Sequence, residues 1–171
     1  RLTVSTVGLL KEIEILAKEF PTALALSLHA PTDEIRRELI PIAKKYSVEE
    51  LILACKNFPR IKNSRTTVEY VIIKDVNDSL ESAKKLADLL KGYPFKVNLI
   101  PFNPHSEIPF ERPSQEIIER FQKYLLSKGI LTTLRKSKGL GIDAACGQLG
   151  AKLLKSLTPN SINKETAVGT G

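Results

Sequence analysis

The stretch Ala23-Leu24-Ala25-Leu26-Ser27-Leu28 decides the fold class of this chain. It is a near-continuous apolar run, which is typical of a strand buried in a parallel sheet between layers of helices. His29 follows the run directly and places a polar ring at the end of the strand. The stretch therefore predicts an α/β fold in which residues 23–28 form a buried strand.

Strand and helix patterns alternate on both sides of this run. We expect further strands at residues 2–6, 66–73, 95–101 and 130–135, with helical spacing between them. Such alternation predicts parallel strands joined by right-handed crossovers, in a doubly wound or a barrel-like sheet. Five strands cannot close an eight-stranded barrel. We therefore expect an open, partial parallel β/α barrel that lacks N-terminal strands.

Caps and apolar spacing predict the helices. Ser47 and Glu50 form a capping box at the start of one helix, and Asp78 with Glu81 is expected to cap the next. A short helix is expected after Thr32. The residues expected to pack on the sheet are Leu9, Ile13, Leu16 and Phe20, then Leu80, Ala83, Leu86 and Leu90, and finally Ile118, Phe121 and Leu125.

Polar side chains gather where the predicted strands end, which is where barrel-like folds bind their ligands. Glu69, on the third strand, is a further candidate that could line the sheet interior. The polar residues at the strand ends are Ser5 and Thr6, Ser27 and His29, Asn98 and Asn103, and Arg135 and Lys136. They predict a site on one edge of the sheet.

Each of these positions has a functional and a structural interpretation. A hydroxyl such as Ser5 ahead of a helix suits a carboxylate or a ribose oxygen, and Ser27 with the ring or backbone of His29 could bind a polar cofactor. The Asn103 amide suits an adenine edge or an amino-acid head group. The alternatives are a plain strand end at Ser5, a satisfied rim histidine at His29 and a turn at Asn103-Pro104.

The charge balance permits a nucleic-acid partner. The 171-residue chain carries 26 Lys and Arg against 19 Asp and Glu, a net charge of +7. The basic loop of Arg135, Lys136 and Lys138 favours phosphate contacts over its alternative, a solvated charged loop. A second basic stretch contains Lys56, Arg60, Lys62 and Arg65. With no apolar run near about 18 residues and no signal peptide, we expect a cytoplasmic chain with no membrane partner.

The two cysteines differ in their surroundings. Cys55 follows the apolar run Leu51-Ile52-Leu53-Ala54 and is expected to be a core thiol. Cys146 stands between Ala145 and Gly147, where small neighbours would let a large partner reach the sulfur, although a structural role is the alternative. The chain contains no Met and opens directly on a strand pattern, so we expect it to be the C-terminal part of a longer protein.

The segment Ile142-Asp143-Ala144-Ala145-Cys146-Gly147-Gln148-Leu149 resembles the methyl-carrying cysteine segment of the RlmN/Cfr family of radical S-adenosylmethionine (SAM) RNA methyltransferases. The resemblance covers residues 1–153 and implies the C-terminal part of a radical SAM partial barrel. Residues 154–171 are expected to form a polar, disordered tail. The other family-like segments, in family order, are Ser5-Thr6-Val7-Gly8, Ser27-Leu28-His29-Ala30-Pro31, Glu69-Tyr70-Val71, Val76-Asn77-Asp78 and Leu99-Ile100-Pro101.

The resemblance implies a chemistry and assigns residues to it. Cys146 would take a methyl group from one SAM, and a radical made from a second SAM at a [4Fe-4S] cluster would activate it for attachment to adenine. The product would be an adenosine methylated in 23S rRNA, and in tRNA for the carbon-2 branch. Flavodoxin or ferredoxin would donate electrons, and Arg135, Lys136 and Lys138 would contact RNA. The implied SAM contacts are Ser5, Ser27, Leu28, His29 and Asn103.

Within the family, His29-Ala30-Pro31, Arg135-Lys136 and the run 98–101 resemble the carbon-2 branch (RlmN) more than the carbon-8 branch (Cfr). The chain departs from the family at Lys138-Gly139-Leu140-Gly141, where an acidic residue is usual. It also lacks the Cys-x-x-x-Cys-x-x-Cys cluster motif, so this chain contains no metal ligands and is expected to be inactive alone. The alternatives are a carbon-8 enzyme, a non-catalytic RNA-binding fragment, and a barrel enzyme that pairs His29 with Cys146 as base and nucleophile.

Overall fold

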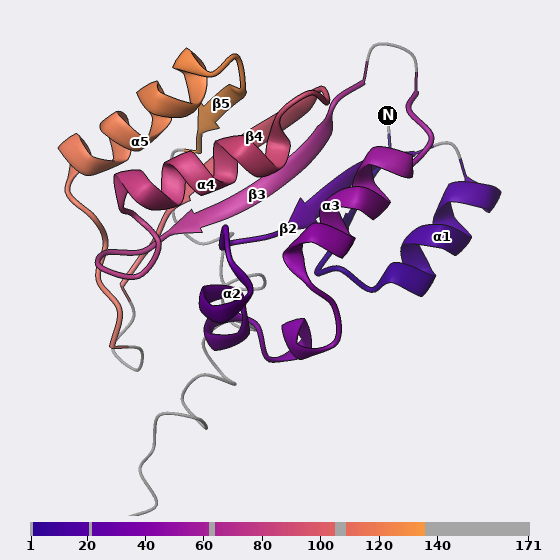
Figure 1. Cartoon of the computed structure of the whole chain (residues 1–171), viewed down its shortest axis with the longest axis horizontal. Coiled ribbons are helices and arrows are strands. Elements are labelled where there is room, and N and C mark those ends of the chain that lie inside the picture. Colours follow the sequence, from indigo (N-terminus) through magenta and orange to yellow (C-terminus); the bar gives the residue numbers. More distant parts are fainter. Residues whose placement is uncertain (1, 21, 62–63, 105–108, 136–171) are drawn as a thin grey trace, which may run out of the picture.

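A computed structural model of the chain describes residues 2–20, 22–61, 64–104 and 109–135 (Figure 1). Its centre is one sheet of five parallel strands in the sequential order β1-β2-β3-β4-β5. The strands are β1 (Thr3–Thr6), β2 (Ala23–Ser27), β3 (Thr66–Ile72), β4 (Phe95–Pro101) and β5 (Leu131–Leu134). The predicted α/β class and the predicted strands are confirmed.

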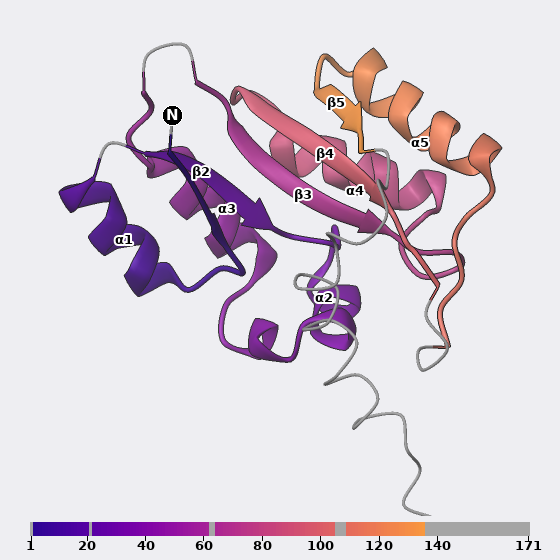
Figure 2. The same cartoon turned by 180° about the vertical axis from the view of Figure 1, so that it is seen from behind.

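The strand order decides between the two predicted kinds of sheet. A doubly wound sheet reverses its order at a switch point, whereas this sheet never reverses. Helices α1 (Leu10–Glu19), α3 (Val48–Asn57), α4 (Leu80–Leu90) and α5 (Gln115–Ser127) lie in front of the sheet in Figure 1, and Figure 2 shows the strands from the opposite side. The sheet is therefore an open, barrel-like one with its long helices on the outer face.

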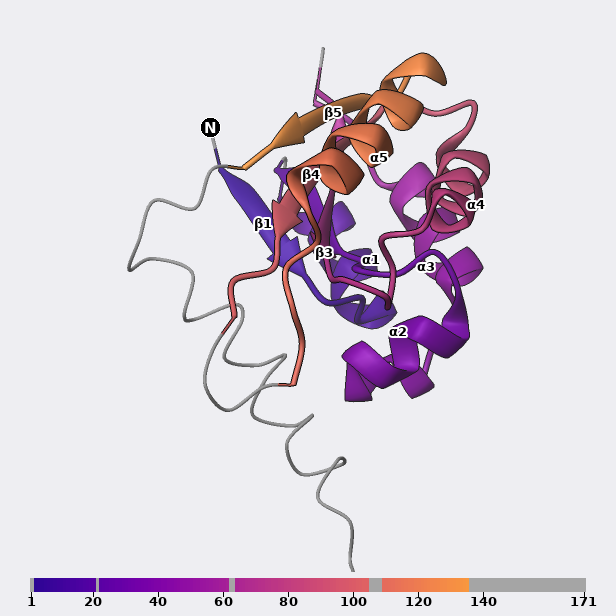
Figure 3. The same cartoon turned by 90° about the vertical axis from the view of Figure 1, so that its left-hand side faces the viewer.

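Side chains that alternate along the strands build the main core between sheet and helices. Val68 and Tyr70 of β3, with Val97 and Leu99 of β4, are fully buried in it. Helices α3, α4 and α5 contribute Leu51, Leu86 and Phe121, among others. Seen nearly edge-on in Figure 3, the strands and these helices form two layers. The intervening residues of each strand therefore face the other way, toward the inner face.

A second, smaller apolar cluster covers the carboxyl ends of β3 and β4. It contains Val71 and Ile73, which alternate with the core residues of β3, together with Ile100 and Phe102. Helix α2 (Asp33–Leu39) and the 3-10 helix η1 (Pro41–Lys44) contribute Leu39 and Ala43 to it. This cluster covers the inner face at the carboxyl ends of the strands, so the polar part of that face lies nearer to their amino ends.

Helix starts follow the predicted caps with one exception. Ser47 and Glu50 form the predicted capping box, and Thr32 caps α2. The prediction that Asp78 caps α4 is wrong: Ser79 is the N-cap, and its hydroxyl accepts from the N–H of Ser82 at 3.0 Å. Asp78 instead accepts from the N–H of Asp75 at 3.1 Å and so closes the preceding turn.

Two predicted core positions are also wrong. Phe20 is 57% exposed because α1 ends at Glu19 and the chain turns away from the helix face there. Leu80 is 39% exposed because it begins α4, ahead of the turns that reach the sheet. The remaining residues of that face, Ala83, Leu86 and Leu90, are buried as predicted, as are Ile118, Phe121 and Leu125.

Candidate functional site

A row of polar side chains crosses the inner face of the sheet. The strand register places Ser27 opposite Glu69, Glu69 opposite Asn98, and Asn98 opposite Thr133. Ser5 of β1 stands beside the row, since it pairs with Ala25, two residues before Ser27. We call Ser5, Ser27, Glu69, Asn98 and Thr133 the inner polar row. It brings together residues of β2, β3, β4 and β5, which are far apart in the sequence, with Ser5 of β1 beside them.

Hydrogen bonds divide the inner polar row into two groups. Glu69 Oε2 accepts from the Ser27 hydroxyl at 3.1 Å and from the Ser5 hydroxyl at 3.4 Å. Thr133 donates to Asn98 Oδ1 at 2.6 Å. Two of the predicted site residues, Ser5 and Ser27, therefore meet at one carboxylate, and the candidate Glu69 lines the sheet interior as expected.

His29 is held by the sheet through its ring. Its backbone is left-handed, with φ of 58°, and this turns the ring back so that Nδ1 accepts from the N–H of Val71 at 3.0 Å. Burial, assisted by the charge of Arg36, lowers the pKa of His29 from 6.5 to about 3. The ring is therefore neutral at ordinary pH, and with Nδ1 an acceptor its hydrogen is on Nε2.

This geometry opposes the alternative in which His29 acts as a base toward Cys146. A nitrogen that carries the hydrogen donates and cannot take up a proton, and the other ring nitrogen is already bonded to Val71. What His29 can offer a ligand is one N–H donor. The structural interpretation of a satisfied rim histidine is thus confirmed for Nδ1, while Nε2 stays compatible with a cofactor contact.

Asn77 joins the strand ends beside His29 through hydrogen bonds to the backbone. It is completely buried, and its Nδ2 donates to the carbonyls of His29 and Val71, both at 2.7 Å. Its Oδ1 accepts from the N–H of Ile73 at 2.7 Å. The sequence singled out Val76-Asn77-Asp78 only as a family-like segment, because nothing in the pattern shows that one amide satisfies three backbone groups.

Arg36 fixes the ends of β1 and β2 from helix α2. The side chain is only 1% exposed. Its Nη2 donates to the carbonyls of Val7 at 2.6 Å and Ser27 at 3.4 Å, and its Nε donates to Leu28 at 3.2 Å. Burial lowers its pKa to about 10, against the opposing charge of Asp33, so it remains charged. Sequence reasoning missed this residue because a charged side chain on a short helix ordinarily faces water.

Leu28 takes part through its backbone alone. Its side chain is fully buried in the main core. Its N–H donates to the carbonyl of Glu69 at 3.1 Å, and its own carbonyl accepts from Arg36. A carbonyl oxygen has two lone pairs, so one remains for a ligand. The prediction that Leu28 contacts a cofactor thus concerns this single acceptor.

Asn103 and Arg135 lie at the same carboxyl edge. Asn103 is exposed and follows Phe102, whose N–H donates to Ile72 at 3.0 Å as the last bond between β3 and β4. Arg135 is exposed too, and its N–H donates to Leu99 at 2.9 Å. The other predicted site residues, Lys136, Lys138 and Cys146, are outside the residues that the structure describes.

Arg60 and Arg65 of the second basic stretch lie at the amino end of the sheet, away from this site. Arg65 directly precedes β3, at the amino end of the strand, and Arg60 stacks over the ring of Tyr93 at 5.7 Å. Cys55 is fully buried, as predicted, and burial raises its pKa to about 12. Neither feature contributes to the carboxyl edge.

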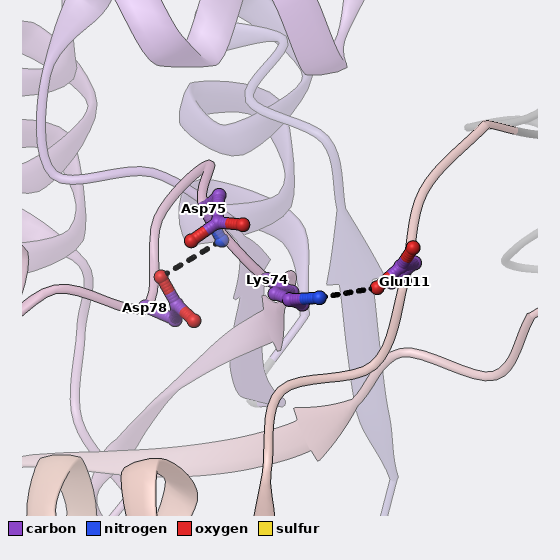
Figure 4. A network of polar contacts seen from close by, with 4 residues as sticks. All are labelled: Lys74, Asp75, Asp78 and Glu111. Carbon is purple, nitrogen blue, oxygen red and sulfur yellow. Dashed lines mark hydrogen bonds and ion pairs between the residues drawn. The ribbon is translucent and has the colours of Figure 1, made fainter.

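Two loops at the carboxyl edge are tied together by polar contacts (Figure 4). The Lys74 ammonium pairs with the Glu111 carboxylate, and the N–H of Lys74 donates to the Glu111 carbonyl at 3.0 Å. The same loop contains the Asp75–Asp78 turn, in which Asp75 has φ of 58°. The segment after β3 and the segment before α5 are therefore held side by side.

The described residues contain neither a metal-ligand cluster nor a membrane-spanning helix. Within those ranges no group of three or more His, Cys, Asp and Glu side chains could hold a metal ion. The helices described there are all too short or too polar to cross a membrane. The expectation that this chain supplies no cluster ligands stays a prediction for the remaining residues.

Comparisons with known proteins give relatives by sequence and by structure, although no family model matches the chain. It is 52% identical over 153 residues to the dual-specificity RNA methyltransferase RlmN of Nautilia profundicola, covering 89% of this chain and 43% of that protein. For the RlmN of Geobacter sulfurreducens the identity is 46% over 168 residues, covering 98% and 46%. The chain thus spans less than half the length of these relatives.

Solved structures agree with the sequence matches. A radical SAM methyltransferase from Sphaerobacter thermophilus superposes with a TM-score of 0.79 at 50% identity, over 86% of this chain and 44% of that one. A domain of pyruvate-formate lyase-activating enzyme from Bacteroides vulgatus, at 17% identity and a TM-score of 0.58, shares the fold alone. Fold and sequence together place the chain in the radical SAM class. Within that class its sequence matches the RlmN family of RNA methyltransferases over less than half of the length of those proteins.

Proposed function

We propose that the chain forms the SAM-binding and methyl-carrying segment of an enzyme that methylates carbon 2 of an adenosine in 23S rRNA and in tRNA. The observation that carries this proposal is the meeting of Ser5 and Ser27 on the inner face, with His29 at the adjoining strand end. Relatives that share about half of the residues are named RNA methyltransferases, and a solved structure at 50% identity is named a radical SAM methyltransferase. The choice of carbon 2 rests on the family-like segments 29–31 and 98–101.

The residues present fit SAM. Together with a [4Fe-4S] cluster, SAM supplies a methyl group and radical chemistry. Ser5 and Ser27 offer hydroxyl oxygens, His29 offers its Nε2 hydrogen, and Asn103 offers an amide that both donates and accepts. SAM carries an ammonium group, a carboxylate, ribose hydroxyls and an adenine edge, so these groups complement it.

Cys146 is the proposed methyl carrier. Methyl transfer to sulfur needs the thiolate, which is the nucleophilic form. The sequence holds two cysteines, and Cys55 is excluded from this role by complete burial and a pKa raised to about 12. The assignment to Cys146 is thus supported both by the family-like octapeptide and by the state of the other thiol.

The cluster must be held by residues other than those of this chain. The family motif has three cysteines, whereas the sequence has two, which are 91 positions apart. We therefore propose that the chain alone has no methyltransferase activity. In the cell it would act in the cytoplasm as part of a protein with that motif, and with flavodoxin or ferredoxin as electron donor.

RNA is proposed to approach the carboxyl edge. Arg135 is exposed there, and Lys136 and Lys138 follow it in the sequence. Basic side chains contact phosphates without reading the bases, so this loop would hold the RNA backbone. The target adenine must be unstacked, because its ring edge is covered in a helix.

The test uses the protein as the cell makes it, purified without oxygen and reconstituted with iron and sulfide. It is incubated with SAM, a reductant and unmethylated 23S rRNA or tRNA, and the nucleosides are analysed by mass spectrometry. We expect 2-methyladenosine from both RNAs. Cys146→Ala should abolish it, whereas the matched variant Cys55→Ala should retain it, since Cys55 only packs in the core.

Other results would select an alternative. Formation of 8-methyladenosine would assign the protein to the carbon-8 branch. RNA binding that survives Cys146→Ala, in a protein that methylates nothing under these conditions, would favour a binding role. If the protein is isolated in an active form and its Cys146 carries no methyl group, the proposed role of Cys146 as methyl carrier is contradicted.

A further inference from the structure

Glu69 connects three strands, β1, β2 and β3. Its backbone carbonyl accepts from the N–H groups of Leu28 at 3.1 Å and His29 at 3.3 Å. Its side-chain Oε2 accepts from Ser27 of β2 and Ser5 of β1. All four partners, Ser5, Ser27, Leu28 and His29, are predicted SAM contacts. Yet Glu69 was assigned no role beyond lining the sheet.

The two bonds to Oε2 determine what the serines can do. A hydroxyl has one hydrogen and two acceptor lone pairs. The hydrogens of Ser27 and Ser5 point to the carboxylate. Both oxygens are therefore left as acceptors for a ligand, and they suit a donor such as an ammonium group or a ribose hydroxyl. A serine without this partner could turn its hydrogen toward the ligand and lose that preference.

Glu69 is not needed for the core. Its side chain is only partly buried and faces away from the helices, between the buried neighbours Val68 and Tyr70. Its backbone bonds to Leu28 and His29 do not depend on the side chain. An isosteric change at Glu69 should therefore alter the inner polar row and leave the packing intact.

We propose that Glu69 is a positioning residue of the SAM site, which orients the hydroxyls of Ser5 and Ser27 as acceptors for the hydrogen-bond donors of SAM. The inference rests on the proposed function, because it needs SAM on this face. Glu69 acts through the serines, and we assign it no contact with the reacting atoms. The carboxylate also places a negative charge beneath the ligand, which favours the cationic sulfonium compound over anions.

The first experiment measures SAM binding by calorimetry with the anaerobically purified protein as the cell makes it. Glu69→Gln keeps the size of the side chain but replaces one acceptor oxygen by a donor. We expect about a tenfold weaker affinity for SAM, the size of one lost hydrogen bond of this kind. The matched control Glu14→Gln, on the exposed outer side of α1, should bind SAM like the wild type.

A mutant cycle then shows whether Glu69 acts through the serines. In a Ser5→Ala/Ser27→Ala background, Glu69→Gln should weaken SAM binding by about twofold or less, since the partners of the carboxylate are gone. If Ser27 is replaced by Thr instead of Ala in this background, a hydroxyl is kept, and Glu69→Gln should again weaken SAM binding. The unfolding temperature of each variant is recorded, so that a change in affinity can be separated from a change in fold.

The outcomes separate this inference from the proposed function. If the wild type binds SAM and Glu69→Gln binds it equally well, the positioning role is overturned while the proposed function stands. A tenfold loss that persists in the serine-free background also overturns it, because Glu69 then contacts the ligand directly or acts on the fold. Failure of the wild type to bind SAM would overturn both.

Discussion

The imidazole Nδ1 of His29 accepts a hydrogen bond from the backbone N–H of Val71, 42 residues further along the chain. A side chain thereby takes the place of a backbone acceptor at the end of β3. Asn77 completes the arrangement, since its amide bonds the carbonyls of both residues. The strand ends that form the candidate site are thus joined by side chains, and each of these can be tested by substitution.

His29 should make the protein less stable as pH falls. The folded-state pKa of about 3 is below the unfolded value of 6.5, so the unfolded chain binds the extra proton between these values. The stabilising contribution is complete above pH 6.5 and is lost as pH falls toward about 3. Denaturant unfolding between pH 6 and 4 should show a loss approaching about 1.4 kcal/mol per pH unit from this group.

His29→Asn provides the comparison. Asn cannot titrate, tolerates the left-handed backbone that His29 adopts, and offers an oxygen to Val71. The pH dependence of unfolding in this window should become flatter by that amount. If wild type and variant keep the same slope, His29 is not the group responsible, and its ring is not held neutral in the way described here.

Arg36→Lys should destabilise the ends of β1 and β2. The guanidinium bonds three backbone carbonyls from a buried position, and an ammonium cannot reproduce that fork. The expected loss in the free energy of unfolding is about 2–4 kcal/mol. Arg37→Lys, the exposed neighbour on the same helix, should change stability by less than about 0.5 kcal/mol. Equal effects at the two positions would contradict the burial of Arg36.

Asn77→Ala should leave buried backbone groups of His29, Val71 and Ile73 without partners. We expect a loss of roughly 2–4 kcal/mol in the free energy of unfolding. Amide hydrogen exchange should accelerate at Ile73, whose N–H donates to Asn77 Oδ1. Asn57→Ala, at the exposed end of α3, is the matched control and should have little effect. Unchanged exchange at Ile73 would refute the bond.

Cys55 should resist alkylation in the folded protein. Complete burial shields the sulfur, and a pKa near 12 keeps it in the thiol form. Iodoacetamide at neutral pH should modify Cys55 only after denaturant is added, as seen by mass spectrometry of the peptide. Rapid native labelling of Cys55 would show that α3 does not pack on the sheet as described.

The framework of the fold is predictable from local patterns. Each strand begins and ends within one residue of its predicted limits, because β-branched and apolar runs such as 66–73 are bounded by polar turns. The sequential strand order is not a local property. It depends on how the helices pack, so strand and helix patterns alone fit both a doubly wound and a barrel-like sheet, and the expectation of a partial barrel, which is confirmed, rested on the strand count and the polar strand ends.

The candidate site is predictable only in part. Ser5, Ser27 and His29 are recognisable as polar residues at strand ends, and the structure brings the two serines together at Glu69. Arg36 gave no signal, since its burial arises from tertiary contacts of its guanidinium with the carbonyls of Val7, Ser27 and Leu28, which a local pattern does not encode. Asp78 and Ser79 are adjacent potential caps, and only the turn geometry decides between them.

The alternation of faces along β3 and β4 separates two kinds of evolutionary change. Substitutions at Val68, Tyr70, Val97 or Leu99 act on the packed outer face and are limited by folding. Substitutions at Glu69 or Asn98 act on the inner polar row and are limited by what that row must bind. A lineage can therefore alter ligand preference one pleat at a time while it inherits the same core.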